Sequence, residues 1–306
     1  MKLVALAGGV GGAKLADGLA QLLPPENLTI IVNTGDDFEH LGLYISPDLD
    51  TVCYTLAGLS NPETDWGRKE ETFHVMETLQ KLGGPSWFNL GDRDLATHIE
   101  RTRLLREGRS LSRITRDFCN VWGVRQSVLP MSDQPVHTMV DTAEFGELSF
   151  QEYFVHRKCE PRVKGFYFTG IETARPAPGV LEAIEQADGI VVCPSNPWVS
   201  IDPILAIAGL RSALEAKQVI SVSPIIDGKT VKGPAAKMFT ELGIQPSALA
   251  VVHHYGKILS GFILDNKDAY LGSNIPIPVW VTDILMKNQV DRKRLAQDVL
   301  NLIQTL

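Results

Sequence analysis

Cysteine is scarce in this sequence, and its spacing matches no disulfide or zinc pattern. The four cysteines, Cys53, Cys119, Cys159 and Cys193, form neither a C-x-x-C pair nor a Cys/His cluster with metal-ligand spacing. A chain of 306 residues with so few cysteines is not a disulfide scaffold. We therefore expect reduced thiols and a cytoplasmic protein.

Long apolar runs and an excess of positive charge are also missing. No stretch approaches the roughly 20 apolar residues that a membrane-spanning helix needs. The apolar run Leu3–Ala7 is too short for a signal peptide, so we expect a buried strand there. The formal net charge of −7 argues against binding to nucleic-acid phosphates. Neither a membrane nor a nucleic acid is an expected partner.

Lysine and arginine are absent from one long stretch, between Lys14 and Arg68. Its nine acids are Asp17, Glu26, Asp36, Asp37, Glu39, Asp48, Asp50, Glu63 and Asp65. The rest of the chain has 27 acids against 29 bases. The negative charge of the protein therefore belongs to its N-terminal third.

Apolar runs that alternate with amphipathic stretches predict an α/β fold. Hydrophobic residues make up 44% of the chain, enough for a sizeable core, and the length fits two domains or one with an elaboration. Continuous apolar runs are typical of strands covered on both faces of a parallel sheet. We expect strands at 2–7, 28–33, 189–193, 218–223, 249–253 and 278–282, and helices at 12–23, 200–216, 234–243 and 291–305, the last capped by Asp291. This order predicts a doubly wound, mainly parallel sheet.

The middle of the chain has a different pattern. Residues 92–107 and 110–122 are predicted helices, whereas 145–156 and 163–169 alternate apolar and polar residues as half-exposed strands do. We therefore expect a smaller α+β portion at 66–174, inserted into a nucleotide-binding sheet domain formed by 1–65 and 175–306.

A glycine-rich turn, GGVGGAK, follows the first predicted strand. Its backbone N–H groups and the following helix N-terminus can approach a phosphate closely. It is not a Walker A loop, because Ala13 and Leu15 stand where a glycine and a hydroxyl are needed. It is also an imperfect dinucleotide fingerprint, because Lys14 replaces the third small residue. We expect a phosphate or diphosphate here; the alternative is a tight turn that only packs helix on sheet.

Two acidic motifs lie in the base-free stretch. NTGDD, with Asp36 and Asp37, ends the second strand, and SPDLDT carries Asp48 and Asp50. A ligand set made of carboxylates, with no His or Cys in it, suits Mg²⁺, which commonly bridges carboxylates and substrate phosphates. We expect a functional role for Asp37, Asp48 and Asp50. The remaining acids Asp17, Glu26, Glu63 and Asp65 are expected to be solvated or helix-capping.

Further polar residues can complete a nucleotide-binding crevice. Arg93 stands out from the arginines that follow it because Asp92 and Asp94 flank it at a helix start, and arginine binds phosphates and stacks on flat rings. Small polar residues also follow the later strands, as in PSNP and SPIIDGK. No Gly-x-Ser-x-Gly, His-Glu-x-x-His or reactive Cys/His motif is present. These features favour direct phosphoryl or nucleotidyl transfer without a covalent intermediate.

Several motifs, taken in order, resemble a known family. The sequence contains AGGVGGAK, NTGDD, ISPDLDT, TDWGRKEETFH, LGDRDLATH, LPMSDQPV, PSNPWVSI and SPIIDGKTVKGPAAK. Together they resemble the 2-phospho-L-lactate transferase family of coenzyme F420 biosynthesis over nearly the whole chain. The pair PDLDT and GDRD is far more specific than a glycine turn alone.

The resemblance implies a reaction and a fold. A phospholactyl or phosphoenolpyruvyl group would pass from a guanosine diphospho donor to the terminal ribityl hydroxyl of the deazaflavin FO, with release of GMP and a requirement for Mg²⁺. The implied fold is Rossmann-like with a smaller α/β portion, often in a homodimer. The bacterial style of VGGAK and WGRKEETFH is compatible with phosphoenolpyruvate as the donor moiety, although no residue decides between the two donors.

Site residues are carried over by position. Asp50 and Arg93 would contact the acceptor, and Asp50 would orient or deprotonate its hydroxyl or act through the metal. Asp37 and Asp50 would contact Mg²⁺, with Asp36 and Asp48 as alternatives. The implied donor-binding residues are Gly9, Gly11 and Gly12 at the diphosphate, and Ser195, Asn196, Ser223 and Gly228 on the guanosine side.

Two other functions compete with this one. A non-catalytic regulator that binds nucleotides or nucleotide-sugars could share the glycine turn and the fold, but it need not keep PDLDT and GDRD. A nicotinamide-dependent oxidoreductase is disfavoured by Lys14 in the fingerprint and by the lack of a recognisable hydride-transfer acid.

Overall fold

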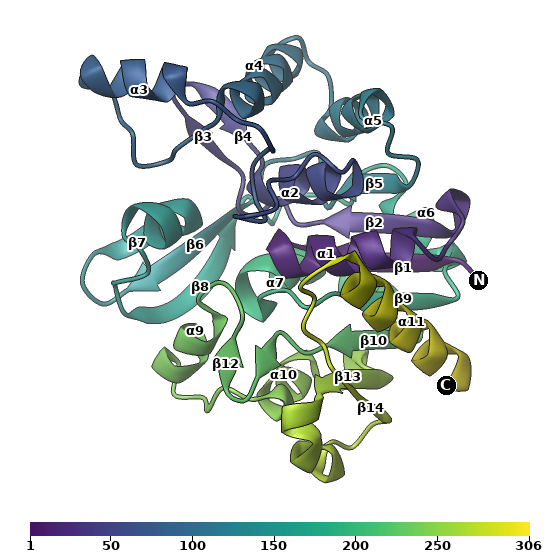
Figure 1. Cartoon of the computed structure of the whole chain (residues 1–306). Coiled ribbons are helices and arrows are strands. Elements are labelled where there is room, and N and C mark those ends of the chain that lie inside the picture. The colour runs from purple at the N-terminus through teal and green to yellow at the C-terminus, as the bar shows by residue number, and fades with distance from the viewer.

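A seven-stranded sheet runs through the centre of the computed structural model, which describes all 306 residues (Figure 1). Its order is β14-β13-β10-β9-β1-β2-β5, and every neighbouring pair is parallel. The strands are β1 (Leu3–Ala7), β2 (Leu28–Val32), β5 (Ser127–Pro130), β9 (Gly189–Val192), β10 (Val219–Val222), β13 (Gly261–Asp265) and β14 (Val279–Thr282). The chain starts in the middle of the sheet and winds outwards in both directions, as in Rossmann folds. The predicted doubly wound parallel sheet is confirmed.

Alternation along the strands creates a core on each face of the sheet. On β1, Leu3 and Ala5 belong to the core under α1, α2 and α11, whereas Val4 and Leu6 belong to the core on the opposite face. Figure 1 shows α1 and α11 lying on the same face. The helices of the first face include α1 (Gly9–Ala20), α2 (Pro47–Leu56) and α11 (Gln289–Thr305); those of the second include α6 (Val180–Gln186), α8 (Leu210–Glu215) and α10 (Ala248–Tyr255).

Apart from α2, α6 and the sheet strand β5, the segments between β2 and β9 form the part of the molecule beside the sheet. They include the hairpin β3–β4 (Phe38–His40, Leu43–Ile45) and the helices α3 (His74–Lys81), α4 (Asp92–Arg106) and α5 (Leu111–Val121). A three-stranded antiparallel sheet, β7-β6-β8, follows (Gly146–Ser149, His137–Thr142, Val163–Thr169). The edge strand β5 of the central sheet lies within the predicted inserted portion 66–174. This portion therefore contributes one strand to the main sheet. The prediction that residues 66–174 form a separate α+β portion stays a prediction.

Shorter elements connect the main ones. They are η1 (Pro25–Asn27), η2 (Glu152–His156), η3 (Pro197–Ile201), α7 (Asp202–Ala206), β11 (Ile225–Ile226), β12 (Lys229–Thr230), α9 (Ala235–Glu241), η4 (Gly256–Ile258) and η5 (Asn266–Asn274). None of the helices combines the length and the apolar composition that crossing a bilayer requires.

The predicted strand 249–253 is wrong. These residues lie in helix α10, where the Ser247 hydroxyl accepts a hydrogen bond from the backbone N–H of Ala250 at 3.1 Å. A short apolar run has no periodicity that separates a buried strand from a buried helix. The strand of this region is β13, which follows the helix.

Other boundaries differ for local reasons. Helix α1 begins at Gly9 rather than at residue 12, so the glycines occupy its first turns. The predicted helix 200–216 is broken, with Gly209 in a left-handed conformation before α8. Asn288, not Asp291, caps α11, because its side chain accepts from the Asp291 N–H. Only 146–149 of the predicted strand 145–156 is extended, and η2 follows.

Candidate active site

A cavity of about 650 Å³ opens at the carboxyl ends of the central strands. Its walls contain Gly8 after β1, Asp36 after β2, Ser195 after β9 and Ser223 after β10. The chain reverses its winding between β1 and β9, and doubly wound sheets bind ligands at this point. The volume is in the range of small-molecule sites.

The glycine segment forms one wall and packs tightly against its neighbours. Gly9 has φ +62°, a left-handed conformation that favours glycine, and a Cβ on Gly11 would lie 2.2 Å from the carbonyl oxygen of Pro194. Gly9 and Gly11 line the cavity, whereas Gly12 lies behind them, where a Cβ would lie 2.8 Å from Ser195 Oγ. The segment therefore joins helix to sheet and also places two of its three predicted glycines at the cavity.

Small polar residues that follow β9 and β10 line the neighbouring wall. The Ser195 hydroxyl donates to the Gly8 carbonyl oxygen at 2.8 Å, which ties this wall to the glycine segment. Asn196 accepts from the Trp198 N–H at 3.1 Å, and Ser223 accepts from the Ile225 N–H at 3.1 Å. Three of the four residues predicted for the guanosine side thus line the cavity: Ser195, Asn196 and Ser223. The fourth, Gly228, lies outside its wall, in the turn between β11 and β12.

Asp36, Asp37 and Asp48 are three neighbouring buried carboxylates, and Asp48 lies against Gly8 and Gly9 of the glycine segment. Burial raises the pKa of Asp48 to about 6, although hydrogen bonds from the Asn33 amide and the Gly9 N–H oppose the rise. Burial also raises the pKa values of Asp36 and Asp37 well above the usual range, and the proximity of Asp48 contributes at Asp36. One oxygen of each of these two side chains, Oδ1, has no hydrogen-bond partner. None of these three carboxylates forms an ion pair with a positive counter-charge, although the charge of Arg101 opposes the rise in the pKa of Asp37.

Asp50 has such a counter-charge. Arg101 binds its carboxylate through both terminal nitrogens, with Nη1 at 2.9 Å from Oδ2. Both side chains are buried, and burial opposes the positive charge of Arg101, but Asp50 raises the pKa of the guanidinium above its ordinary value. Asp50 lies on α2 and Arg101 on α4, so the pair also joins two helices. The carboxylate is held in one orientation at the cavity wall.

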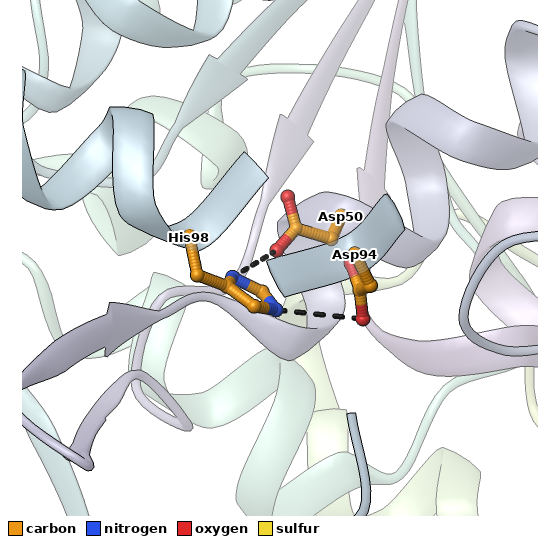
Figure 2. A group of neighbouring side chains, drawn as sticks. All are labelled: Asp50, Asp94 and His98. Carbon is orange, nitrogen blue, oxygen red and sulfur yellow. Dashed lines mark ion pairs between the residues drawn. The ribbon is translucent and has the colours of Figure 1, made fainter. Parts of the chain in front are cut away.

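His98 lies between Asp50 and Asp94 (Figure 2). Its Nδ1 is 3.7 Å from Asp50 Oδ2, and its Nε2 is 3.4 Å from Asp94 Oδ2. Tyr54 donates to Asp94 Oδ1 at 2.7 Å. Burial opposes ionisation of Asp94, but His98 and Tyr54 outweigh it and lower the pKa of this carboxyl. Potential ligand atoms of Asp50, Asp94 and His98 lie within 4.8 Å of one another. A metal ion bound here would compete with Arg101 for Asp50.

The other end of the cavity is apolar. It is lined by Phe88, Leu90, Phe150, Phe154 and Val155, and the rings of Phe150 and Phe154 stack with centroids 5.3 Å apart. A flat aromatic molecule suits such a wall. The cavity thus joins an apolar end to a polar end, with Asp48 and Asp50 also in its wall.

Two further predicted site residues do not line the cavity. Asp37 is buried next to it and accepts a hydrogen bond from the Ser46 hydroxyl at 2.8 Å. Arg93 lies at the start of α4 with about half of its side chain exposed, and it pairs with Glu70 at 3.1 Å. The structure therefore brings together Asp50, Gly9, Gly11, Ser195, Asn196 and Ser223, and leaves Asp37, Arg93, Gly12 and Gly228 behind or beside the wall.

The sequence interpretation missed some residues of the site. Arg101 is one of the arginines that follow Arg93 and was not singled out. It shares a helix face with His98, three residues earlier, and with Asp94, seven residues earlier. That polar stripe is a signal for a buried network. Asp65, predicted to be solvated or capping, instead pairs with Lys14 at 3.0 Å. Nothing in the local pattern around Asp65 indicates this long-range contact.

Comparison with known proteins identifies relatives along the whole chain. A phosphoenolpyruvate transferase of Thermobifida fusca is 46% identical over 282 residues, covering 88% of each chain. One of Streptomyces griseus is 44% identical over 299 residues, covering 93% of this chain and 94% of the relative. A 2-phospho-L-lactate transferase of Methanosarcina mazei is 38% identical over 301 residues, covering 97% and 99%.

A solved structure and a family model complete the comparison. A UPF0052 family member from Bacillus halodurans has a TM-score of 0.65 at 17% identity, covering 98% of both chains, which supports the fold alone. The family model for 2-phospho-L-lactate transferase CofD matches residues 3–300. The chain therefore belongs to the 2-phospho-L-lactate transferase family, and its role is that of a transferase in coenzyme F420 biosynthesis.

Proposed function

We propose that this transferase moves a phosphoenolpyruvyl or phospholactyl group from a guanosine diphospho donor to the deazaflavin FO. The acceptor hydroxyl oxygen forms a bond to the phosphorus that carries the three-carbon acid. The phosphoanhydride bond to GMP breaks, GMP takes the electron pair, and the hydroxyl proton passes to a carboxylate or to water. The cavity carries this proposal, because one continuous space joins a polar end to an apolar end.

The two ends suit the two substrates. We assign the donor diphosphate to Gly9 and Gly11 and the guanosine to the wall formed by Ser195, Asn196 and Ser223. The deazaflavin ring would lie against the apolar end, where stacking and burial stabilise flat rings. The ribityl chain would then lead the terminal hydroxyl towards Asp50. Holding both reactants in one cavity supplies the proximity on which direct displacement depends.

The buried acidic cluster supports Mg²⁺ as the bound cation. The unpartnered oxygens of Asp36 and Asp37 are hard ligands of the kind that Mg²⁺ prefers. We propose these two residues together with Asp48 as its first ligands, and Asp50 would join them only if Arg101 moves. When bound, the ion would neutralise charge on the donor diphosphate.

Asp50 acts on the acceptor in this proposal. With Arg101 bound to both of its oxygens, the carboxylate is fixed in one orientation, which suits it to accept a hydrogen bond from the acceptor hydroxyl and orient it. Arg93 lies outside the cavity wall, so contact with the acceptor would require its exposed side chain to leave Glu70.

The relatives bear on the donor and on the competing functions. The relatives named phosphoenolpyruvate transferase include one of 46% identity, against 38% for the relative from Methanosarcina mazei, which supports a phosphoenolpyruvyl donor. Relatives named as transferases also favour catalysis over a purely regulatory role. A homodimer and a cytoplasmic location stay predictions.

A turnover experiment tests the proposal. Purified protein is incubated with FO, Mg²⁺ and the guanosine diphospho derivative of either phosphoenolpyruvate or phospholactate, and GMP and the phosphodiester product are quantified by chromatography. Equal amounts of GMP and product, formed faster with the phosphoenolpyruvyl donor, are expected. Donor binding without GMP release from either donor would contradict the proposal and favour the regulator.

A further inference from the structure

Two lysines from distant parts of the chain meet on one carboxylate at the cavity. Lys14 of α1 and Lys232, after β12, both contact the same oxygen of Asp65, and the Lys14 Nζ–Asp65 Oδ2 distance is 3.0 Å. Lys232 Nζ also donates to the Thr64 carbonyl oxygen at 3.0 Å. Both lysines line the cavity, with Lys14 in the same helix as Gly9 and Gly11.

The loop that carries Asp65 is anchored at its base. The Lys69 N–H donates to the Leu59 carbonyl oxygen at 2.8 Å, and the Asn61 N–H donates to the Gly67 carbonyl oxygen at 3.1 Å. Asp65 lies at the tip with φ +64°, a conformation that aspartate and asparagine tolerate better than most residues. The loop therefore presents the carboxylate directly to the two ammonium groups.

We propose that Lys14 and Lys232 form a binding site for the phosphate groups of the donor, and that the Asp65 carboxylate occupies this site until the donor arrives. The inference rests on the proposed guanosine diphospho donor. A phosphate and a carboxylate are both anionic oxygen acceptors, so they compete for the same ammonium groups. In a cavity with Asp36, Asp48 and Asp50 in its wall, these lysines offset repulsion of an anionic ligand.

Asp65 is in this view an internal competitor of the donor. The two lysines leave Asp65 when phosphate binds, and the tip of the loop is released from the cavity mouth. Trp66, which lines the cavity next to Asp65 with 49% of its surface exposed, changes its surroundings in the same step. Donor binding therefore alters the fluorescence of Trp66.

Calorimetric titrations with GDP and with inorganic diphosphate, used separately, test the inference. Asp65→Asn removes the competing charge and keeps a residue that tolerates the loop conformation. We expect the dissociation constants of both probes to fall by about three- to tenfold, because the phosphate no longer has to displace two partly exposed ion pairs. Unchanged or weaker binding would overturn the inference, because Asp65 would then only position the lysines.

Two further variants make the result specific. Glu63→Gln removes an equal charge from the same loop, where the side chain is exposed and has no ion pair, and should leave both dissociation constants unchanged. Adding Lys232→Met to Asp65→Asn should abolish the gain, and a gain that persists would contradict the lysine site. If ADP binds as tightly as GDP while diphosphate still gains from Asp65→Asn, the guanosine donor is wrong but the phosphate site stands.

Discussion

Arg101 and Asp50 form a buried, two-nitrogen ion pair in the wall of the cavity. The pair links α4 to α2 and fixes a carboxylate in the cavity wall. A buried charge that loses its partner is costly, so each residue depends on the other. This relationship distinguishes Asp50 from Asp36 and Asp48, which form no ion pair and have no cation among the causes of their pKa shifts.

Removal of Arg101 should therefore damage both stability and turnover. Arg101→Met leaves Asp50 as an uncompensated buried charge, and we expect a loss of about 3–5 kcal/mol in the free energy of unfolding, measured with urea. Arg103→Met is the control, because Arg103 is an exposed arginine of the same helix that pairs with Glu100 and Glu107. Equal effects of the two substitutions would contradict a special role for the buried pair.

Asp50→Asn should lower turnover by about 100-fold or more, because an amide oxygen accepts a weaker hydrogen bond from the FO hydroxyl than a carboxylate does. It also leaves Arg101 without its partner, so the variant should be assayed well below its thermal midpoint, with the folded fraction measured by circular dichroism. The affinity for GDP should change little, since the donor end of the cavity is intact. Near-wild-type turnover would rule out both the orienting and the metal role of Asp50.

The raised pKa of Asp48 predicts a dependence of stability on pH. The folded protein holds this proton up to about pH 6, whereas the unfolded chain releases it near pH 4. The protonated carboxyl therefore contributes its full stabilisation when the pH is below the pKa of Asp48 in the unfolded chain. This stabilisation is lost as the pH rises through the pKa of Asp48 in the folded protein. Without metal, wild-type protein should lose on the order of 2 kcal/mol relative to Asp48→Asn between pH 4 and pH 7.

Urea unfolding of the two proteins across this pH range, with a chelator present, measures the difference. Asp36 and Asp37 also have raised pKa values, so some pH dependence should remain in Asp48→Asn. Identical slopes for the two proteins would show that Asp48 does not hold its proton in the folded state.

Magnesium should stabilise the folded protein through the acidic cluster. At a concentration about 100 times the dissociation constant, Mg²⁺ should add about 2.7 kcal/mol to the free energy of unfolding. Asp37→Asn should remove most of this gain, whereas Glu39→Gln, an exposed acid of the same base-free stretch, should not. Differential scanning calorimetry with and without Mg²⁺ checks this. A full gain in Asp37→Asn would exclude that residue as a ligand.

The sequence predicted the central sheet well because its strands are continuous apolar runs between clear turns. The prediction of a strand at 249–253 was wrong, because this equally apolar run forms helix α10. The strand β5, which has four residues and ends in Pro130, was not predicted. A run of this length lacks the periodicity that would distinguish the two structures.

The candidate site was predictable where its residues directly follow strands, as Asp36 and Ser195 do. It was less predictable where partners come from separate elements. Lys14 and Lys232 lie 51 and 167 positions from Asp65, so no spacing rule connects them. The position of Arg101 beside His98 could have been predicted, because helical periodicity places the two residues on one face of the helix.

A crystal structure of the protein with GDP, FO and Mn²⁺ in place of Mg²⁺ tests the central claim most directly: that both substrates occupy this one cavity and meet at Asp50. The account predicts the diphosphate at Gly9 and Gly11, the deazaflavin ring against Phe150 and Phe154, and its terminal hydroxyl at Asp50. Anomalous scattering should locate Mn²⁺ beside Asp37. Either substrate bound outside the cavity, or a hydroxyl directed away from Asp50, would contradict it.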